Sequence, residues 1–222
     1  MRRIPFVKYQ GYGNDYIVLE SQQVGDVGSI SAIVRGICDR HYGVGGDGVA
    51  LISRTSVKGT HFNVRIFNAD GSEAAMSGNG TRCAAAHLYQ SELWTEPVLR
   101  LDTKAGAKTY RLLGREEGHF KFEAEIGRPQ FQSEKIPFRS PVSLERVIDF
   151  PLELSDAEVV RVTALQMCNP NCILFVDDFN DVDWRRLGRE IEKHSLFPER
   201  TNVEFVRVID RGRVESRVWE RG

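Results

Sequence analysis

The sequence contains few cysteines, no long hydrophobic run and almost no net charge. Its 222 residues include four cysteines, and 30 basic side chains nearly balance 31 acidic ones. A net charge of −1 provides no long-range attraction to nucleic acid or to an anionic membrane. No apolar stretch is long enough to span a membrane, and no hydrophobic region follows the first residues as it does in a secretory signal. We therefore expect a cytoplasmic protein that binds neither nucleic acid nor membranes.

The cysteines are too sparse for a disulfide framework in a chain of this length. Cys168 and Cys172 form the only close pair, and a zinc site could be drawn by adding Cys38 and His41. Structural zinc sites usually combine two tight pairs, however, which this chain lacks. Buried free cysteines are common as small hydrophobic residues. We expect reduced thiols, Cys83 included, and no metal.

The remaining composition is that of an ordinary globular protein, with 41% hydrophobic and 27% charged residues. A chain of this length can bury one large core or two modest ones. Residues 128–151 contain four prolines and little periodicity, which indicates a linker. We therefore expect an N-terminal lobe over residues 1–127 and a C-terminal lobe over residues 128–222.

Hydrophobic periodicity predicts a mixture of strands and helices in both lobes. In the first lobe we expect strands at 4–9, 16–19, 49–52, 61–67, 98–103, 108–113 and 119–126, and helices at 29–42 and 84–89. In the second we expect strands at 159–164 and 172–176, a helix from 183, and a hairpin formed by 203–209 and 213–219. Turns are expected at 10–15 and 166–171.

The two lobes share an order of parts that predicts an internal duplication. Residues 13–18 resemble residues 168–173, and residues 65–68 resemble residues 217–220, at nearly the same offset. At that offset the counterpart of Ser77 would lie near position 229. We therefore expect the second lobe of the 222-residue sequence to be incomplete.

The most informative stretch is residues 67–83, in which Gly78-Asn79-Gly80 forms a bend that opens a helix. Such a bend directs free backbone N–H groups and the positive end of the helix dipole at one point. That point suits a carboxylate or a phosphate. Ser77, at its edge, is placed where a reacting atom would be presented.

Asparagines recur at matching places in the two lobes and indicate a cleft for a zwitterionic ligand. The candidates are Asn14, Asn68, Asn79, Asn169 and Asn202. Glu220 suits an ammonium group and Arg221 a carboxylate. The alternative for each asparagine is a role in a turn, where its side chain bonds the local backbone. A pseudo-twofold cleft also suggests a two-base reaction, for which a thiol is better suited than a serine hydroxyl.

Seven motifs, in order and from end to end, resemble the diaminopimelate epimerase family of amino-acid racemases, which need no pyridoxal phosphate. They are KYQGYGNDYIV (8–18), DRHYGVGGDG (39–48), FNADGSE (67–73), GNGTRC (78–83), NP (169–170), TNV (201–203) and WERG (219–222). The resemblance implies an α/β (α+β) fold of two pseudo-symmetric lobes, each a mixed or antiparallel sheet wrapped around a central helix.

The resemblance also implies the site. Ser77 stands at the position of the family's first catalytic cysteine, and the second cysteine would lie beyond residue 222. The implied substrate-binding residues are Asn14, Asn68, Gly78, Asn79, Asn169, Asn202, Glu220 and Arg221. The implied reaction interconverts LL- and meso-diaminopimelate for lysine and peptidoglycan precursor synthesis, without a cofactor, in a protein that can form a homodimer. Asn171 also replaces the family's usual histidine. With Ser77 at the first cysteine position and the second cysteine position beyond residue 222, the resemblance implies impaired catalysis in this chain.

Three other interpretations remain. Residues 43–48 match the G-x-G-x-x-G pattern of dinucleotide enzymes, but that motif requires a preceding strand and a following helix, and the predicted order here is the reverse. A second interpretation is an amino-acid-binding protein that kept the ligand site and lost catalysis. A third is a related isomerase that uses Ser77 on a different amino acid.

Overall fold

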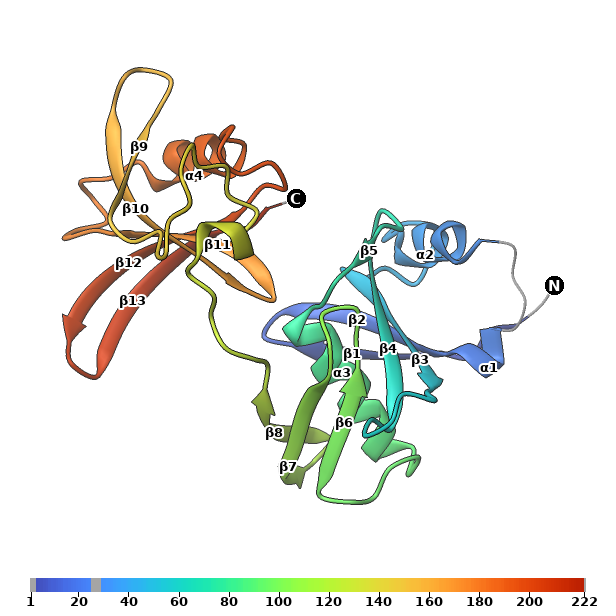
Figure 1. Ribbon diagram of the computed structural model, residues 1–222. Coiled ribbons are helices and arrows are strands. Elements are labelled where there is room, and N and C mark those ends of the chain that lie inside the picture. Colours follow the sequence, from blue (N-terminus) through green and yellow to red (C-terminus); the bar gives the residue numbers. More distant parts are fainter. Residues whose placement is uncertain (1–2, 25–28, 222) are drawn as a thin grey trace. The chain divides into compact units, whose positions relative to one another are not determined.

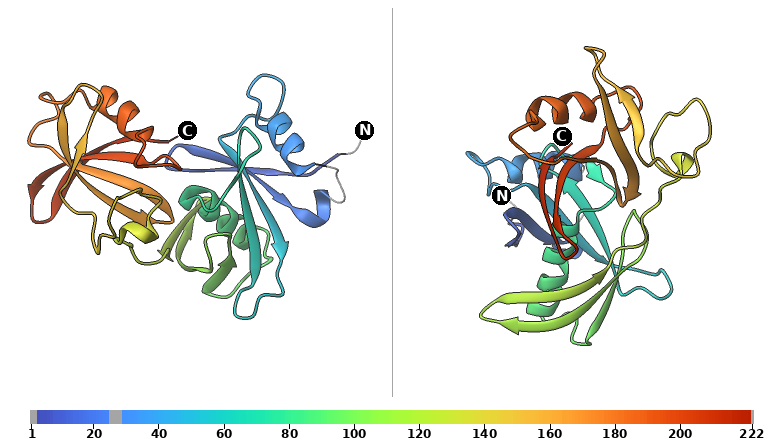
Figure 2. Two further views of the ribbon diagram at one scale, coloured as in Figure 1. Left: turned by 45° about the horizontal axis from the view of Figure 1, so that its top comes forward. Right: turned by 90° about the vertical axis from the view of Figure 1, so that its left-hand side faces the viewer.

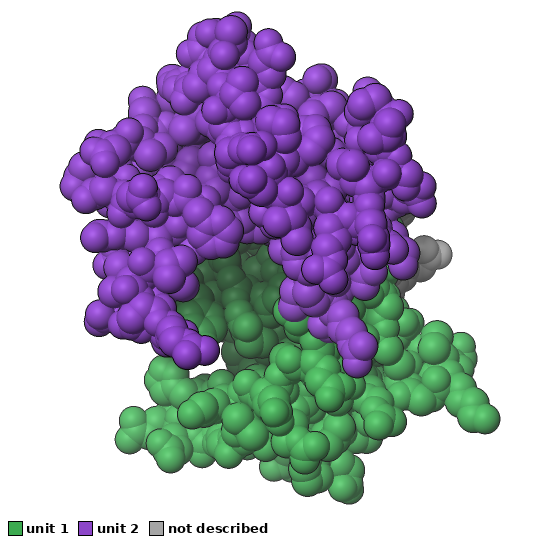
Figure 3. Space-filling model, turned by 60° about the vertical axis from the view of Figure 1, so that its left-hand side comes forward, with its two compact units in different colours: residues 1–126 green, residues 127–222 purple. Residues whose placement is uncertain are grey.

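The computed structural model describes residues 3–24 and 29–221. The chain divides into two compact units, residues 1–126 and residues 127–222, which Figure 3 distinguishes by colour. In the described part of the chain, no helix is both long enough and apolar enough to cross a membrane.

Unit 1 consists of one curled sheet with helices on both of its faces (Figure 1). Its elements are β1 (Val7–Gly11), β2 (Asn14–Glu20), α1 (Ser21–Val24), α2 (Ile30–Cys38), β3 (Gly48–Arg54), β4 (Phe62–Asn68), β5 (Glu73–Ala74), α3 (Gly78–Gln90), β6 (Val98–Asp102), β7 (Lys108–Glu116) and β8 (His119–Glu125). The strand order is β1-β2-β3-β4-β6-β7-β8, and β5 pairs with β4. The β2–β3 and β4–β6 pairs are parallel.

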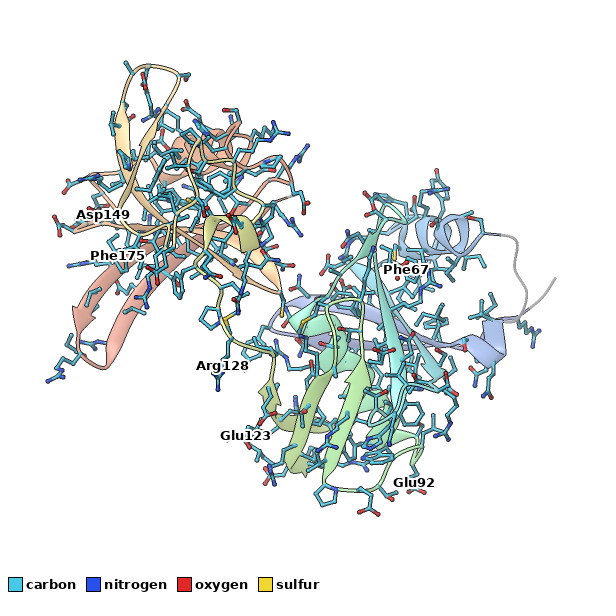
Figure 4. All side chains as sticks on the ribbon, in the orientation of Figure 1. Phe67, Glu92, Glu123, Arg128, Asp149 and Phe175 are labelled. Carbon is cyan, nitrogen blue, oxygen red and sulfur yellow. The ribbon has the colours of Figure 1, made fainter. Side chains whose placement is uncertain are left out.

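Strand β2 is buried on both faces, which explains its unbroken apolar run. Tyr16 and Val18 face the core around α3, whereas Ile17 and Leu19 face the core around α1 and α2. This alternation follows from the two-residue period of a strand. Phe67 of β4 belongs to the α2 side, where Figure 4 labels it.

Helix α3 is the central helix of unit 1. It is buried on most of its circumference, and residues from β2, β3, β4, β6 and β7 surround it. The small side chains Ala84 and Ala85 are fully buried and let the sheet approach closely, while Leu88 fills the core below them. A helix enclosed in this way has no broad polar face, so its sequence shows only weak amphipathic periodicity.

Unit 2 consists of a smaller sheet with one α-helix on its covered face (Figure 2). Its elements are the 3₁₀-helix η1 (Ser133–Lys135), β9 (Phe150–Glu153), β10 (Val159–Met167), β11 (Asn169–Phe175), α4 (Trp184–Glu192), β12 (Asn202–Asp210) and β13 (Arg213–Trp219). The strand order is β13-β12-β11-β10-β9. Asp183 caps α4 by accepting a hydrogen bond from Arg186 N, and Leu187 and Ile191 pack into the core.

The two units repeat one topology, as the sequence predicts. In unit 1, β1–β2 is antiparallel, β2–β3 is parallel across α2, and β3–β4 is antiparallel. In unit 2, β10–β11, β11–β12 across α4, and β12–β13 follow the same pattern. Helix α4 therefore corresponds to α2. The two-lobed α/β fold is confirmed.

Several predicted boundaries are wrong. The turn expected at 10–15 is only two residues long, because Gly11 pairs with Asn14 and both Tyr12 and Gly13 have positive φ. The turn expected at 166–171 narrows to Cys168 between β10 and β11. The predicted helix over 29–42 ends at Cys38, and the glycine bend at 78–80 forms the first turn of α3.

Among the described residues, the face of the unit 2 sheet opposite α4 is largely apolar and contains the half-buried side chain of Glu204. Phe175, which Figure 4 labels, is 66% exposed, and Val214 is 58% exposed. Glu204 lies between the core residues Val203 and Phe205 on β12, so its side chain lies on this opposite face. Its Oε2 atom is buried without a hydrogen-bond partner among the described residues. Burial raises the pKa of Glu204 to about 7.

The raised pKa of Glu204 predicts how stability depends on pH. The folded state binds the Glu204 proton more tightly than the unfolded state does, so protonation of Glu204 stabilises the folded protein at low pH. That effect is lost as the pH rises from about 4.5 through 7. We expect Glu204→Gln to raise the free energy of unfolding at pH 8 by roughly 2 kcal/mol and to have little effect at pH 4.5. Urea denaturation followed by tryptophan fluorescence measures this.

Glu215→Gln, an exposed change on the neighbouring strand β13, is the matched control and should leave the pH dependence intact. Equal gains for Glu204→Gln at pH 4.5 and pH 8 would contradict the assignment.

Candidate active site

Ser77 is the N-cap of α3, and two donors hold its side chain. Its backbone is extended, with φ −131° and ψ 126°, as an N-cap requires. Its Oγ accepts hydrogen bonds from Gly80 N at 3.1 Å and from the Tyr16 hydroxyl at 2.9 Å. Its carbonyl accepts from Thr81 N and from Thr81 Oγ1, which fixes the backbone as well. The Ser77 oxygen is thus an acceptor for two donors.

The first turn of α3 directs backbone donors outward. Gly78 is exposed, and Asn79 and Ser77 are half-buried. The first N–H groups of a helix have no acceptor within the helix and carry the positive end of its dipole. Arg82, one turn further along, adds a guanidinium on the same side as Asn79, whose Oδ1 accepts a hydrogen bond from it. This end of α3 therefore suits an anionic oxygen.

Asn14 and Asn79 form a directed pair of amides. Asn79 Nδ2 donates to Asn14 Oδ1, and Asn14 Nδ2 donates to Asp47 Oδ2 at 3.3 Å. Because Arg82 donates at one end and Asp47 accepts at the other, neither amide can flip without breaking a bond. Each amide nitrogen still has a second hydrogen for a ligand.

Four charged residues form a cluster of ion pairs next to Asn14. Arg40 Nη2 contacts Asp15 Oδ1 at 2.8 Å and Asp47 Oδ1 at 2.9 Å, and Lys8 Nζ lies 2.8 Å from Asp15 Oδ2. Asp47 Oδ2 also accepts from the backbone N–H of Asp15. Hydrogen bonding to Arg40, with a smaller effect of Lys8, holds the pKa of Asp15 far below its usual value despite some desolvation.

Asn68 lies at the end of β4, beside Gly48 in the sheet register. Its Nδ2 donates to Ser72 Oγ at 3.0 Å, and its carbonyl accepts from Gly71 N. In this structure Asn68 therefore organises a turn, which is the alternative role that the sequence leaves open for such asparagines. Its Oδ1 lone pairs are not used in these contacts.

In unit 2 the predicted residues gather where β11 and β12 begin and β13 ends. Asn202 Oδ1 accepts from Arg221 N at 3.1 Å, and Asn202 Nδ2 donates to Asn171 Oδ1 at 3.4 Å. Asn171 Nδ2 donates to the carbonyl of Asn169 at 2.7 Å. Trp219 pairs with Val203, so the antiparallel register places Glu220 opposite Asn202. Gly222, which closes the last sequence motif, lies outside the described residues.

A buried carboxylate supports this strand end. Glu192 is 2% exposed, accepts from Trp219 Nε1 at 3.0 Å, and pairs with Arg200 at 3.1 Å. These contacts fix the indole directly before Glu220 and Arg221. Sequence reasoning did not identify Glu192, because a helical glutamate gives no signal of its partners.

The structure thus groups the predicted residues by unit. Asn14, Ser77, Gly78 and Asn79 lie around the N-terminus of α3, and Asn169, Asn202, Glu220 and Arg221 lie at the strand ends of unit 2. Tyr16, Asp47 and Arg82 are additional contacts that the motifs contain but that sequence reasoning did not single out. Cys83 is no substitute base, because burial raises its thiol pKa to about 11.

Comparison with solved structures identifies the fold class. The chain aligns with a probable proline racemase from Agrobacterium radiobacter K84, covering 97% of this chain and 70% of that one, with a TM-score of 0.66 and 15% identity. A hydroxyproline epimerase from Agrobacterium vitis matches equally well, with a TM-score of 0.66 over 98% of this chain and 69% of that one, also at 15% identity. At this identity the likeness establishes the two-lobed α/β fold alone.

Sequence comparison identifies the family. The sequence model of diaminopimelate epimerase matches residues 6–131 and 163–222. A diaminopimelate epimerase from Halothermothrix orenii is 37% identical over 219 residues, which are 99% of this chain and 76% of that protein. One from Pelotomaculum thermopropionicum is 40% identical over 220 residues, covering 98% of this chain and 76% of that protein. The chain therefore belongs to the diaminopimelate epimerase family of isomerases.

The charged cluster beneath Asn14 yields a prediction for Asp15. We expect Arg40→Gln to raise the pKa of the Asp15 carboxyl toward its ordinary value, because Arg40 has the largest effect on it. Lys8→Gln should raise that pKa less. Titration of the Asp15 carboxyl carbon by NMR compares the two variants, and a larger rise in Lys8→Gln would refute the assignment.

Proposed function

We propose that this chain binds diaminopimelate and interconverts its LL and meso forms far more slowly than a two-thiol enzyme would. The family membership supports the substrate. The observation that carries the impairment is Ser77, a hydroxyl at the place where the family resemblance implies an acid–base cysteine.

The contacts of Ser77 support this impairment. A serine hydroxyl stays protonated near neutral pH unless an adjacent base takes its proton. Both side-chain contacts of Ser77 Oγ are with donors, Tyr16 OH and Gly80 N, and neither donated hydrogen bond removes its proton. Ser77 is therefore suited to donate a hydrogen bond to a ligand oxygen and is a poor base toward a carbon-bound proton.

We assign the α-carboxylate of the ligand to the N-terminus of α3. The backbone N–H groups of Gly78 and Asn79 and the helix dipole favour an anion there. The spare Nδ2 hydrogens of Asn14 and Asn79 are further donors. Among the residues of unit 2, we assign a ligand ammonium group to Glu220 and a ligand carboxylate to Arg221, with Asn169 and Asn202 as further ligand contacts. In unit 1, Asn68 is a further ligand contact.

A catalytically inactive amino-acid-binding protein is the second candidate function, and Asn171 favours it. The family resemblance implies histidine at this position. Here Asn171 bonds the Asn169 carbonyl and Asn202, so it serves to position its neighbours. A related isomerase acting on another amino acid is the third candidate.

We also propose a cytoplasmic location, domains over residues 1–127 and 128–222, no metal or cofactor, and assembly as a homodimer.

Exchange of the α-proton tests the proposed impairment. In D2O with LL- or meso-diaminopimelate, we expect the Ser77 protein to exchange the α-proton slowly but measurably above the background rate. Ser77→Cys should increase the rate by roughly a hundredfold, the lower end for a positioned acid–base group. Ser77→Ala is the control and should match the parent. A parent already as fast as Ser77→Cys would refute the impairment, and calorimetric binding without exchange would identify the inactive binder.

A second prediction concerns Asp47, which orients Asn14. We expect Asp47→Ala to weaken diaminopimelate binding by roughly tenfold, because it frees the Asn14 amide to rotate and leaves its donor unpaired. Lys8→Gln removes a charge from the same cluster without touching Asn14, and should bind as the parent does. Calorimetry measures both, and an equal loss in the two variants would contradict the role given to Asp47.

A further inference from the structure

Tyr16 reaches the N-cap of α3 from a slot that Gly48 and Gly80 leave open along one edge of its ring. Tyr16 is 6% exposed and faces the core around α3. A Cβ atom added at Gly48 or at Gly80 would come within 2.8 Å of Tyr16 Cε1. Real side chains do not pack at that distance, so glycine at both positions leaves room for the ring.

The slot fixes the direction of the phenol. Tyr16 pairs with Gly48 across β2 and β3, and Gly80 lies in the first turn of α3. The space left by Gly48 and Gly80 lies along one edge of the ring, at Cε1 and Cδ1, and the hydroxyl group reaches Ser77 Oγ at 2.9 Å. Gly80 supplies the second donor to the same oxygen through its backbone N–H. Gly48 and Gly80, which make room for the Tyr16 ring, and Ser77, which its hydroxyl group contacts, therefore pack together.

We propose that Tyr16 is a positioning residue that acts through position 77. Its phenol and the Gly80 N–H hold the Ser77 oxygen as an acceptor, so that the remaining O–H faces the ligand. The inference relies on the proposed function only in taking position 77 as ligand-facing. It goes beyond that function by naming Tyr16 as the side chain that makes the residue at position 77 a hydrogen-bond acceptor. Tyr16 thereby also influences whether that residue is protonated.

The same two donors that leave the Ser77 hydroxyl protonated would favour the deprotonated form of a thiol at position 77. Two donors and a helix N-terminus stabilise a negative charge, so a cysteine at position 77 would ionise more readily than a free thiol. Loss of the phenol O–H would remove one of these donors and leave the ring in its slot. The effect of Tyr16 can therefore be measured without any substrate.

The experiment uses Ser77→Cys as a reporter in the 222-residue protein. The rate at which iodoacetamide alkylates the introduced thiol is followed against pH, with peptide mass spectrometry separating it from the four native cysteines, Cys38, Cys83, Cys168 and Cys172. We expect an apparent pKa below about 8.5, the ordinary value for a free thiol. Adding Tyr16→Phe should raise that pKa and slow alkylation at pH 7 by roughly three- to tenfold.

Tyr9→Phe is the matched control. Tyr9 lies opposite Tyr16 on β1, and its hydroxyl contacts His87 rather than Ser77. It should leave the pKa of the reporter thiol unchanged. Fluorotyrosine at position 16, a stronger donor of the same shape, should lower that pKa and keeps the test valid if the phenylalanine variant misfolds. A thiol pKa that does not move with Tyr16→Phe or with fluorotyrosine would overturn the proposal. Failure of the parent to bind diaminopimelate would count against the proposed function and would leave this result standing.

Discussion

Two hydrogen bonds to the Ser77 oxygen set the geometry of the end of α3, and the packing of unit 1 holds both donors in place. One donor is the Gly80 N–H of the helix, and the other is the Tyr16 phenol of β2. The strand can supply that phenol because Gly48 and Gly80 leave space for its ring. A helix enclosed by its sheet, with a fixed N-terminus, is a rigid support for binding an anion.

The two units share a strand–helix–strand arrangement but carry different polar groups at its end. In both, a helix crosses between two parallel strands, and polar side chains collect where those strands begin. In unit 1 this end combines the Asn14–Asn79 pair with backbone donors of α3. In unit 2 it combines Asn202 with Glu220 and Arg221. Unit 1 thus presents amides together with a helix terminus, and unit 2 presents amides together with side chains of opposite charge.

Sequence patterns predicted most strands and helices and the repeat, because these follow from local periodicity and from the order of motifs. They did not predict α1, β5 or β9, which are only two to four residues long. They predicted the glycine bend at the correct residues but not that these residues form the first turn of α3. That turn depends on the hydrogen bond that the Ser77 side chain accepts from Gly80 N. They predicted turns at 10–15 and 166–171 but made both too long, because the tight turns at Tyr12-Gly13 and Cys168 depend on strand pairing. Tyr16 and Glu192 could not be identified from sequence, because each acts on a residue tens of positions away.

We propose that the end of α3 capped by Ser77 binds a ligand carboxylate. The most direct measurement is the shift of backbone amide NMR signals of the ¹⁵N-labelled protein on titration with diaminopimelate. We expect the largest shifts, which saturate with ligand, at the backbone amides of Gly78, Asn79 and Gly80 and at the side-chain amide of Asn14. Saturable shifts that leave these four groups unmoved would contradict it.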